Sequence, residues 1–478
     1  MFSEKIFINN FAHFYFYPFS YEKPPLHINV LKLPRMFLIN CESMSVKLSS
    51  SHLVSVLDRI DVNEVCKLTL DLVRIQSPRG HEEEVGDFIL KWMNENGIPA
   101  TKQEVSPHRN NVVGRLKGSG GGHSLIFNSH MDTGFGLPED KWILGKPKAS
   151  FIDGWEEGDL LVGANVVNDK GPMAAFLIAA KAIKDAKVSL KGDLILTAVI
   201  GEIGQAPIDE FQGSVYEGKG FGTRYLVNHG TVADYALVAE GTNFIVSRAE
   251  AGDVWFKISI YARGGIYMPF LERPYKFLDE PNSIVKSVPV IEAIEKWAYE
   301  YQEKNKLDFE DGTIVPKVNI GAIRSGLGVR PSQTPGICSL YVDVRLAPNA
   351  EVGKVKEELS NVVSSCNVEF TIEPYLYRRG HVGKNVDLLV DSIKKAHKSV
   401  LNEDPDIKKK KVPAPFASMW RDLNAFNEAG IPSVTYGPPS WTYKSLSGES
   451  NPSLAKSDLE KTSKIYALTA LNICGVSQ

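Results

Sequence analysis

Cysteine is scarce in this chain and follows no ligand pattern. Five cysteines occur among the 478 residues, at scattered positions and without a Cys-x-x-Cys spacing. Such usage is typical of a reducing compartment, so we predict a cytoplasmic protein. No Cys/His spacing of the zinc-finger kind occurs either, so any metal ion has to be held by histidine and carboxylate side chains.

An excess of positive charge and a long apolar run are also lacking. The chain has 54 Lys and Arg against 57 Asp and Glu, and a formal net charge of -3. We therefore expect no nucleic-acid partner and no membrane partner, since no apolar run reaches the length of a membrane-spanning helix. With 43% hydrophobic and 23% charged residues, the composition is that of an ordinary globular protein. We expect its partner to be a small-molecule substrate or another protein.

The first 45 residues differ from the rest. They are rich in aromatic residues but interrupted by Asn, His, Tyr and Pro, unlike the apolar core of a signal peptide. We interpret residues 1–45 as an N-terminal extension. A start codon placed too early, with Met36 or Met44 as the true beginning, is one explanation, and a structured extension is the alternative.

Helical and strand patterns alternate over residues 46–248 and again over 379–478. Helical spacing of apolar residues is found in segments such as MAAFLIAAKAIKDA, and strand patterns are found in NNVVGRL, HSLIFNSH, GDLILTAVIGE, ADYALVAEG and PSVTYG. Strands separated by helices indicate a mostly parallel sheet covered on both faces. We therefore predict an α/β catalytic domain made of these two separated segments.

The middle of the chain follows another pattern. Residues 249–378 contain strand, helix, strand, strand, helix and strand segments in that order. This β-α-β-β-α-β order is typical of a ferredoxin-like α+β domain. We predict that it forms an inserted domain between the two catalytic segments.

Three predicted strands end in residues that bind metals. LIFNSH ends at His130, LILTAVIGE at Glu202 and YALVAE at Glu240. In a parallel sheet these ends share one edge, which is where open α/β sheets bind ligands. One histidine with two carboxylates suits Zn, Mn or Co better than Mg. Taken singly, His130 is equally compatible with a strand cap or a core hydrogen bond, and each glutamate with a helix cap.

Further candidates lie beside these strand ends. Asp132, two positions after His130, is placed to accept a hydrogen bond from its imidazole, although a turn-stabilising aspartate is the alternative. Asn168 or Asp169, in the loop VGANVVNDKGP before a helix, can reach the same edge, and an Asx turn with a helix cap explains them as well on local grounds.

Five segments together resemble the acetylornithine deacetylase, succinyl-diaminopimelate desuccinylase and carboxypeptidase G metallopeptidase family. They are SHMDTGFG, VNDKGPMAA, GEIG, AEGT and MWRDLNAFNEAGIPSVTYGPP, in the family's order over roughly residues 60–470. The resemblance implies a zinc-peptidase-like fold and hydrolysis of amide bonds beside a carboxylate at two metal ions. His130 and Glu240 would bind one ion, Glu202 would bind the other, and Asp132 would orient His130. The inserted domain would be the family's lid and its dimerisation surface, so we predict a homodimer.

The chain departs from this family pattern at four places. Asn168 stands where the family has a bridging aspartate, and Gly201 stands where it has the general-base glutamate. The lid histidine is replaced near Tyr267, and the last metal histidine has no counterpart between Tyr436 and Gln478.

These departures favour one metal ion over two, because a neutral Asn168 cannot offset the charge of two close dications. His130, Glu240 and either Asn168 or Asp169 then hold the ion. Glu202 is free to act as the general base. The competing interpretation keeps Glu202 as a ligand and has no obvious base.

For substrate binding we predict Tyr267 and Arg330. Arg345 is a further candidate, with a structural salt bridge as the alternative. His229 and His381 are candidates to replace a missing histidine, and surface positions are the alternative for both.

The sequence thus predicts a metal-dependent hydrolase of C–N bonds in small carboxylate-bearing substrates, such as a dipeptide, an N-acyl amino acid or a related amide. The alternative is a catalytically silent homologue that binds a metal or ligand as a scaffold. The loss of Glu at position 201 and of two histidines motivates this alternative.

Overall fold

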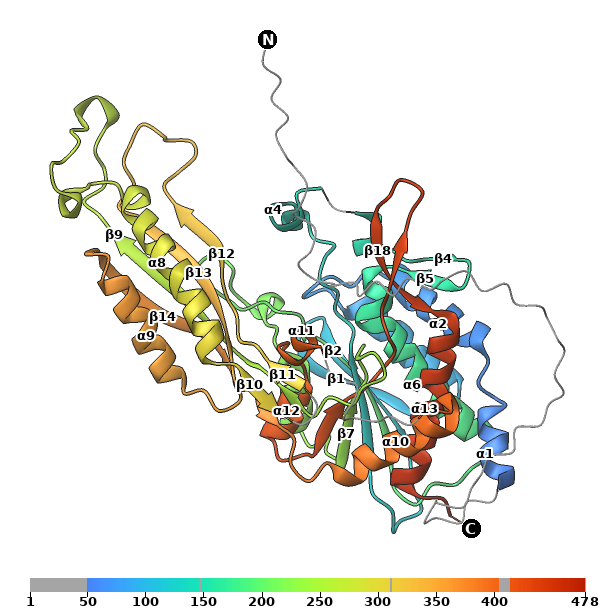
Figure 1. Ribbon diagram of the computed structural model, residues 1–478. Coiled ribbons are helices and arrows are strands. Elements are labelled where there is room, and N and C mark those ends of the chain that lie inside the picture. Colours follow the sequence, from blue (N-terminus) through green and yellow to red (C-terminus); the bar gives the residue numbers. More distant parts are fainter. Residues whose placement is uncertain (1–49, 147, 310–311, 404–412, 478) are drawn as a thin grey trace.

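The computed structural model describes residues 50–146, 148–309, 312–403 and 413–477 (Figure 1). The extension 1–45 lies outside these residues. In the part of the chain that is described, no helix combines the length and the apolarity needed to cross a membrane.

A six-stranded sheet forms the centre of the larger part of the molecule. Its strands lie in the order β1-β2-β6-β3-β7-β16, and the four strands from β6 to β16 run parallel. β1 and β2 are antiparallel additions at one edge, so the prediction of a mostly parallel sheet is confirmed. The strands are β1 (Ala100–Ser106), β2 (Arg109–Leu116), β3 (Leu125–His130), β6 (Leu194–Val199), β7 (Tyr235–Val238) and β16 (Ser433–Thr435).

Helices cover both faces of this sheet, because its inner strands are apolar on both sides. Leu125 and Phe127 of β3 pack in the larger core, which the longer helices close. Ile126, between them, points the other way and packs with the core under α7 and α12. The helices of the larger core are α1 (Ser50–Leu57), α2 (Val62–Arg74), α3 (Glu83–Glu95), α6 (Gly171–Asp185), α10 (Asp387–Leu401) and α13 (Lys456–Cys474); those of the other face are α7 (Phe221–Asn228) and α12 (Leu423–Glu428).

A small four-stranded sheet, in the order β17-β18-β5-β4, stands beside the start of α6 and was not predicted. Its strands are short and partly polar, so they carry little of the pattern that marks a buried strand. They are β4 (Trp155–Glu157), β5 (Leu160–Val162), β17 (Trp441–Lys444) and β18 (Ser450–Ala455). The remaining short elements are helices α4 (Lys141–Leu144), α5 (Ala149–Ile152) and α11 (Ala414–Ala417), and single turns at Pro138–Asp140, Ser214–Tyr216, Met268–Phe270 and Phe277–Asp279.

Residues 252–378 form a separate antiparallel sheet with two helices, named here the ferredoxin-like unit. Its strand order β12-β13-β9-β14, with chain order β9-α8-β12-β13-α9-β14, is the predicted split-βαβ topology. It has its own apolar core. The elements are β9 (Gly252–Tyr261), α8 (Ser283–Lys304), β12 (Val318–Ser325), β13 (Ile337–Leu346), α9 (Val352–Ser364) and β14 (Glu369–Arg378).

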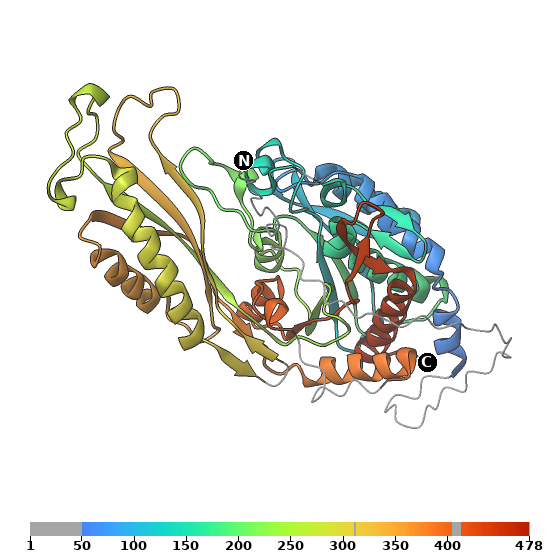
Figure 2. The ribbon, with the colours of Figure 1, turned by 45° about the horizontal axis from the view of Figure 1, so that its top comes forward.

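The ferredoxin-like unit lies to one side of the central sheet, with α8 and α9 on its outer face (Figures 1 and 2). Two short strand pairs adjoin it: β8 (Ala249–Glu250) with β15 (His381–Val382), and β10 (Leu307–Phe309) with β11 (Gly312–Ile314). The pair β8–β15 lies where the chain enters and leaves the unit. The division into a catalytic domain of 46–248 with 379–478 and an inserted domain of 249–378 remains a prediction.

Candidate metal centre

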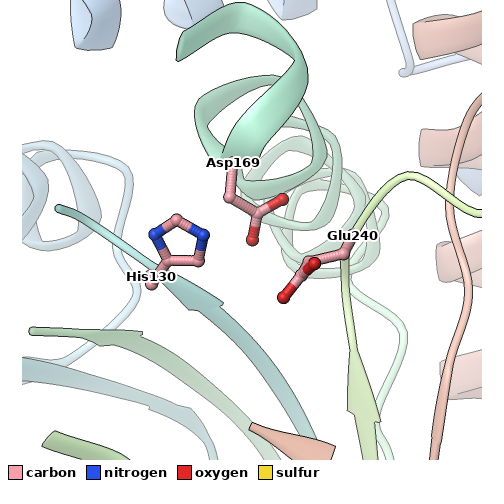
Figure 3. Close-up of side chains that lie close together, drawn as sticks. All are labelled: His130, Asp169 and Glu240. Carbon is pink, nitrogen blue, oxygen red and sulfur yellow. The ribbon is translucent and has the colours of Figure 1, made fainter. Parts of the chain in front are cut away.

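Three buried side chains converge at the carboxyl edge of the parallel strands. His130 is the last residue of β3, Glu240 follows the end of β7, and Asp169 comes from the turn before α6. Figure 3 shows the three side chains pointing toward one another. One ligand atom from each lies within 4.8 Å of the other two. A histidine nitrogen and two carboxylate oxygens at such spacing form a suitable donor set for one divalent ion.

Asp169 has an oxygen that lacks a partner. A kinked turn, Val166–Lys170, carries it, and the backbone angles of Asn168 and Asp169 there are not helical. The Lys170 side chain anchors this turn by donating to two carbonyls at the end of α2. Ser129 donates a hydrogen bond to Oδ2 of Asp169 at 2.5 Å, whereas the buried Oδ1 has no hydrogen-bond partner among the residues that the structure describes. An unsatisfied buried carboxylate oxygen is costly, so this geometry fits a cation.

The imidazole of His130 is held from both sides. Its Nδ1 lies 2.9 Å from the backbone carbonyl oxygen of Asp132, and its Nε2 lies 2.7 Å from Oδ1 of Asn168. Both oxygens are hydrogen-bond acceptors, so the two contacts favour a ring that carries a proton on each nitrogen. Burial opposes this charge, but the carboxylates of Asp132, Glu202 and Asp169 raise the pKa of His130 well above its usual value. A metal ion at Nε2 would displace that proton and the contact with Asn168.

The Asp132 carboxylate links two strand ends. Its oxygens accept hydrogen bonds from the backbone N–H groups of Glu202, at 3.1 Å, and Ile203, at 2.8 Å. Its Oδ1 also lies 3.5 Å from Nδ1 of His130, so the backbone carbonyl of Asp132 is the nearer partner of the ring. Burial opposes ionisation, but His130 and these N–H groups lower the pKa of Asp132. Asp132 therefore fixes the segment that carries Glu202 relative to His130.

Glu202 lies beside the three converging residues. Its Oε2 is 3.8 Å from Nε2 of His130, and the side chain is buried. Burial, and then the charges of Glu240 and Asp422, raise the pKa of Glu202 well above its usual value. The position is compatible with both predicted roles, as a base beside the ion and as a ligand.

A side chain at position 201 would be strained in this backbone. The φ of Gly201 is +61°, and a Cβ there would lie 3.0 Å from the Arg109 guanidinium and 3.0 Å from the carbonyl oxygen of Glu217. The proton acceptor therefore has to come from another residue.

Sequence reasoning did not find Arg421, whose guanidinium is buried against the centre. Its Nε donates to Oε2 of Glu240, and one Nη donates to Oε1 of Glu250 at 2.8 Å. The motif MWRDLNAF contains Arg421, but its partners lie about 180 and 170 residues earlier, and no local pattern links them.

The predicted substrate residues lie elsewhere. Tyr267 and Arg330 are exposed, and the loops that carry them pair with each other through Tyr267 and Gln333. Figures 1 and 2 show both loops at the outer end of the ferredoxin-like unit, away from the central sheet. Within one chain they do not meet the converging residues, because these loops extend beyond β9 and β12 rather than back toward the sheet.

The other candidates take structural positions. Arg345 pairs with Asp253 at 3.3 Å and Asp343 at 3.0 Å, which is the salt-bridge alternative. His229 stacks on Tyr225 at the exposed end of α7, and the backbone of His381 lies opposite that of Glu250 in the short strand pair.

Comparisons with known proteins agree on one family. Residues 126–472 match the family described as peptidase family M20/M25/M40. A Bacillus subtilis protein named N-formyl-4-amino-5-aminomethyl-2-methylpyrimidine deformylase is 26% identical over 78% of this chain and 87% of its own length. A Sulfurisphaera tokodaii protein named [LysW]-lysine/[LysW]-ornithine hydrolase is 23% identical over 81% of this chain and 90% of its own.

The fold has solved counterparts. The structure of the di-peptidase Dug1p from Saccharomyces cerevisiae superposes with a TM-score of 0.66, at 12% identity, over 90% of this chain and all of the other. The family match over residues 126–472 confirms the resemblance predicted from SHMDTGFG and the other segments, and with it the assignment to a class of metal-using hydrolases. The match over most of its length shows that the chain belongs to the peptidase family M20/M25/M40.

Proposed function

We propose that the protein hydrolyses a C–N bond in small carboxylate-bearing amides, at one divalent metal ion held by His130, Asp169 and Glu240. The observation that carries this proposal is the convergence of three buried side chains at the carboxyl edge of the parallel strands. One of them, Asp169, has a carboxylate oxygen without a hydrogen-bond partner in the described part of the chain. The names of the relatives, a deformylase and a [LysW]-lysine/[LysW]-ornithine hydrolase, support the amide class. Zn, Mn and Co all suit the donor set.

Asp169, rather than Asn168, is the third ligand in this proposal. Among the described residues, Oδ1 of Asp169 has no hydrogen-bond partner, and the Asp169 carboxyl groups with His130 and Glu240 at ligand spacing. Asn168 offers only a neutral amide oxygen. The neutral amide of Asn168 supplies no charge for a second ion, which supports one metal ion per chain rather than two.

The protein's own residues divide the work of hydrolysis. A bound divalent ion supplies Lewis acidity and brings the pKa of a bound water toward neutrality. Glu202, 3.8 Å from His130, takes the proton of the attacking water and returns it to the leaving amine. Asp132 holds the Glu202 segment through two backbone N–H groups and keeps His130 in register.

Glu202→Gln tests the assignment of the base. We expect kcat to fall by about 10²- to 10⁴-fold on a panel of N-formyl amines, N-acyl amino acids and dipeptides, while metal content stays that of the wild type. Glu240→Gln is the matched comparison and should lose metal together with activity. Loss of metal in the Glu202 variant would instead make Glu202 a ligand.

The same panel of amides also tests whether the protein is a catalytically silent scaffold. The comparisons with known proteins give the scaffold alternative no support. If the protein were a scaffold, the wild type would bind metal but hydrolyse none of the amides. Turnover of any of them above the metal-free blank excludes it.

We also propose that the ferredoxin-like unit is a lid that pairs two copies of the chain. Its outer loops expose Tyr267, Met268, Phe270, Leu327 and Val329, and an apolar patch of this kind is typical of an interaction surface. The substrate contacts predicted for Tyr267 and Arg330 require such a second copy. We propose a cytoplasmic location, since the four described cysteines are free.

A further inference from the structure

The segment between Glu202 and α7 connects the candidate centre with the ferredoxin-like unit. Residues 203–219, named here the strap, leave the centre next to Glu202 and return to the same place. There the backbone N–H of Lys219 donates to the carbonyl oxygen of Ile203 at 3.5 Å. In Figures 1 and 2 the strap lies between the ferredoxin-like unit and the central sheet. Both ends of the strap are therefore at the candidate centre.

Hydrogen bonds join the two arms of the strap. Nε2 of Gln205 donates to the carbonyl oxygen of Val215 at 2.7 Å. Nearer the tip, the backbones of Ile208 and Phe211 exchange two hydrogen bonds, at 2.9 and 2.8 Å. Hydrogen-bonded elements of this kind carry coupling between separate sites, so a displacement of the tip is passed to the base of the strap.

The tip of the strap is bound to the sheet of the ferredoxin-like unit. The Asp209 carboxylate accepts hydrogen bonds from the Lys257 ammonium of β9 and from the Tyr341 hydroxyl of β13. Lys257 and Tyr341 stand directly opposite each other in the register of these strands. Their neighbours Phe256 and Val342 pack in the core under α8 and α9, so Lys257 and Tyr341 lie on the other face of the sheet.

Asp209 makes the firmer of two contacts at the tip. Glu210 pairs with Arg324 of β12, but these side chains are 51% and 54% exposed, and exposed ion pairs contribute little. The side chains of Asp209 and Lys257 are only 25% and 21% exposed. Burial opposes ionisation, but the hydrogen bonds from Lys257 and Tyr341 lower the pKa of Asp209, so it stays charged at neutral pH. Two donors on one charged group make a strong contact.

The base of the strap carries Glu202. Asp132 accepts hydrogen bonds from the N–H groups of Glu202 and Ile203, at 3.1 and 2.8 Å, and Arg109 donates to the carbonyl oxygen of Glu217 on the returning arm at 2.9 Å. Among the described residues, the only ion-pair contact of the Glu202 carboxylate is with His130, at 3.8 Å. The position of this carboxylate therefore depends mainly on the backbone of the strap.

We propose that Asp209 is a positioning residue for Glu202, because its contacts with Lys257 and Tyr341 let the ferredoxin-like unit hold the strap and, through it, the base. This inference rests on the proposed function. Proton transfer by Glu202 is then efficient only while the ferredoxin-like unit keeps this position beside the central sheet. The unit contributes to the reaction through the strap, without a contact to the metal ion.

Hydrogen–deuterium exchange measured by mass spectrometry tests this proposal without an activity assay. Asp209→Asn removes the charge and suits the backbone, since the φ of Asp209 is 49° and Asn adopts this left-handed region more readily than most residues. The peptide that contains the N–H groups of Glu202 and Ile203 should exchange faster by about tenfold or more, because its tether to the unit is lost. Peptides of α13 should exchange as in the wild type. Unchanged exchange at Glu202 and Ile203 would overturn the proposal.

Glu210→Gln is the matched control, because it removes the neighbouring carboxylate from the same tip and breaks only the exposed pair with Arg324. The control should exchange as the wild type does, and equal acceleration in both variants would overturn the special role of Asp209. If Asp209→Asn does not fold, Tyr341→Phe removes one hydroxyl and leaves the ion pair intact. Tyr341→Phe should accelerate exchange of the same peptide to a smaller extent, and no acceleration would overturn the proposal.

Kinetics on an amide that the wild type hydrolyses provides the second measurement. Asp209→Asn should lower kcat by about 10- to 100-fold through misplacement of the base, with KM changed by less than about twofold and metal content unchanged. Lys257→Arg keeps the ion pair and should keep kcat, whereas Lys257→Gln should lose as much as Asp209→Asn. The double variant should be no worse than either single one, because the two residues act as one pair. Additive losses would overturn the proposal.

The outcomes separate this inference from the proposed function. If the wild type hydrolyses none of the amides, the proposed function fails, and the exchange experiment still decides whether Asp209 holds the turn that carries Glu202. Faster exchange of this turn at unchanged kcat would overturn the positioning role of Asp209 and leave the proposed function in place.

Discussion

The candidate centre depends on the charge carried by a few buried side chains. Asp169 has one oxygen bound to Ser129 and one without a partner, and His130 is held by Asn168 and by a backbone carbonyl. These neutral contacts position the ligands, whereas the carboxylate charge supplies the attraction for a cation. A change of charge should therefore affect metal binding far more than the loss of a hydrogen bond.

Asp169→Asn should weaken metal binding by on the order of 100-fold or more, because it removes a charged ligand and keeps the shape. Ser129→Ala removes only the hydrogen bond to Asp169 and should weaken binding about tenfold. Competition with a coloured chelator measures both affinities. Equal losses in the two variants would contradict the assignment of Asp169 as a ligand.

At the scale of elements, β3 places His130 and is also the centre of the larger core. Phe127, three residues before His130, lies 5.9 Å from the ring of Phe176 and 5.3 Å from that of Tyr466, between centroids. The side chain is fully buried. The strand thus fixes the centre through packing against α6 and α13.

Phe127→Ala should lower the free energy of unfolding by about 3–5 kcal/mol, since it opens a cavity among rigid neighbours. Urea denaturation of the metal-free protein measures this loss. Leu446→Ala, at the fully exposed tip between β17 and β18, is the comparison and should change stability by less than about 0.5 kcal/mol. Similar losses in both variants would mean that β3 is not held by this packing.

The elements differ in how far the sequence could predict them. β3, β6, β7 and β16 follow from buried apolar runs, and the order of segments in 249–378 predicts the ferredoxin-like unit. β1 and the β17–β18 pair were not predicted, because their partly polar side chains do not form an apolar strand pattern. His130 and Glu240 can be predicted because each follows a buried strand. Asn168 and Asp169 are adjacent, and only the backbone of the local turn determines which of the two faces the centre. The role of Arg421 could not be predicted, because only tertiary contacts bring it to Glu240.

At the scale of the whole molecule, the ferredoxin-like unit joins the rest through a buried ionic cluster. Lys219, before α7, lies 3.0 Å from Asp253 of β9, which also pairs with Arg345 at 3.3 Å. The backbone carbonyl of Lys219 accepts a hydrogen bond from Arg378 at the end of β14. Both ends of the unit are therefore held by one residue of the larger part.

The ionic cluster should make the stability of the protein depend on pH, because Asp343 pairs with its Arg345. Burial, and then the charge of Asp253, raise the pKa of Asp343 to about 7. The folded state then holds a proton that the unfolded state releases near pH 4, so stability should fall as pH rises through 7. Asp343→Asn should reduce this fall, measured by urea denaturation at pH 5.5 and pH 8. An unchanged fall in the variant would show that Asp343 does not cause it.

Pairing through the outer loops predicts a particle of twice the chain mass of 52.8 kDa. Phe270→Asp combined with Val329→Asp should dissociate it, because two charges in an apolar contact cannot be hydrated there. Light scattering after size-exclusion chromatography measures the mass. Leu446→Asp, an exposed apolar residue outside the ferredoxin-like unit, should leave the mass unchanged, and a wild-type monomer at micromolar concentration would contradict the pairing.

Anomalous diffraction from crystals grown with Zn²⁺ or Co²⁺ tests the central claim most directly. The account predicts one strong peak per chain, within about 2.0–2.2 Å of a nitrogen of His130 and of carboxylate oxygens of Asp169 and Glu240. A peak that touches none of these three residues, or none at all at saturating metal, would contradict it.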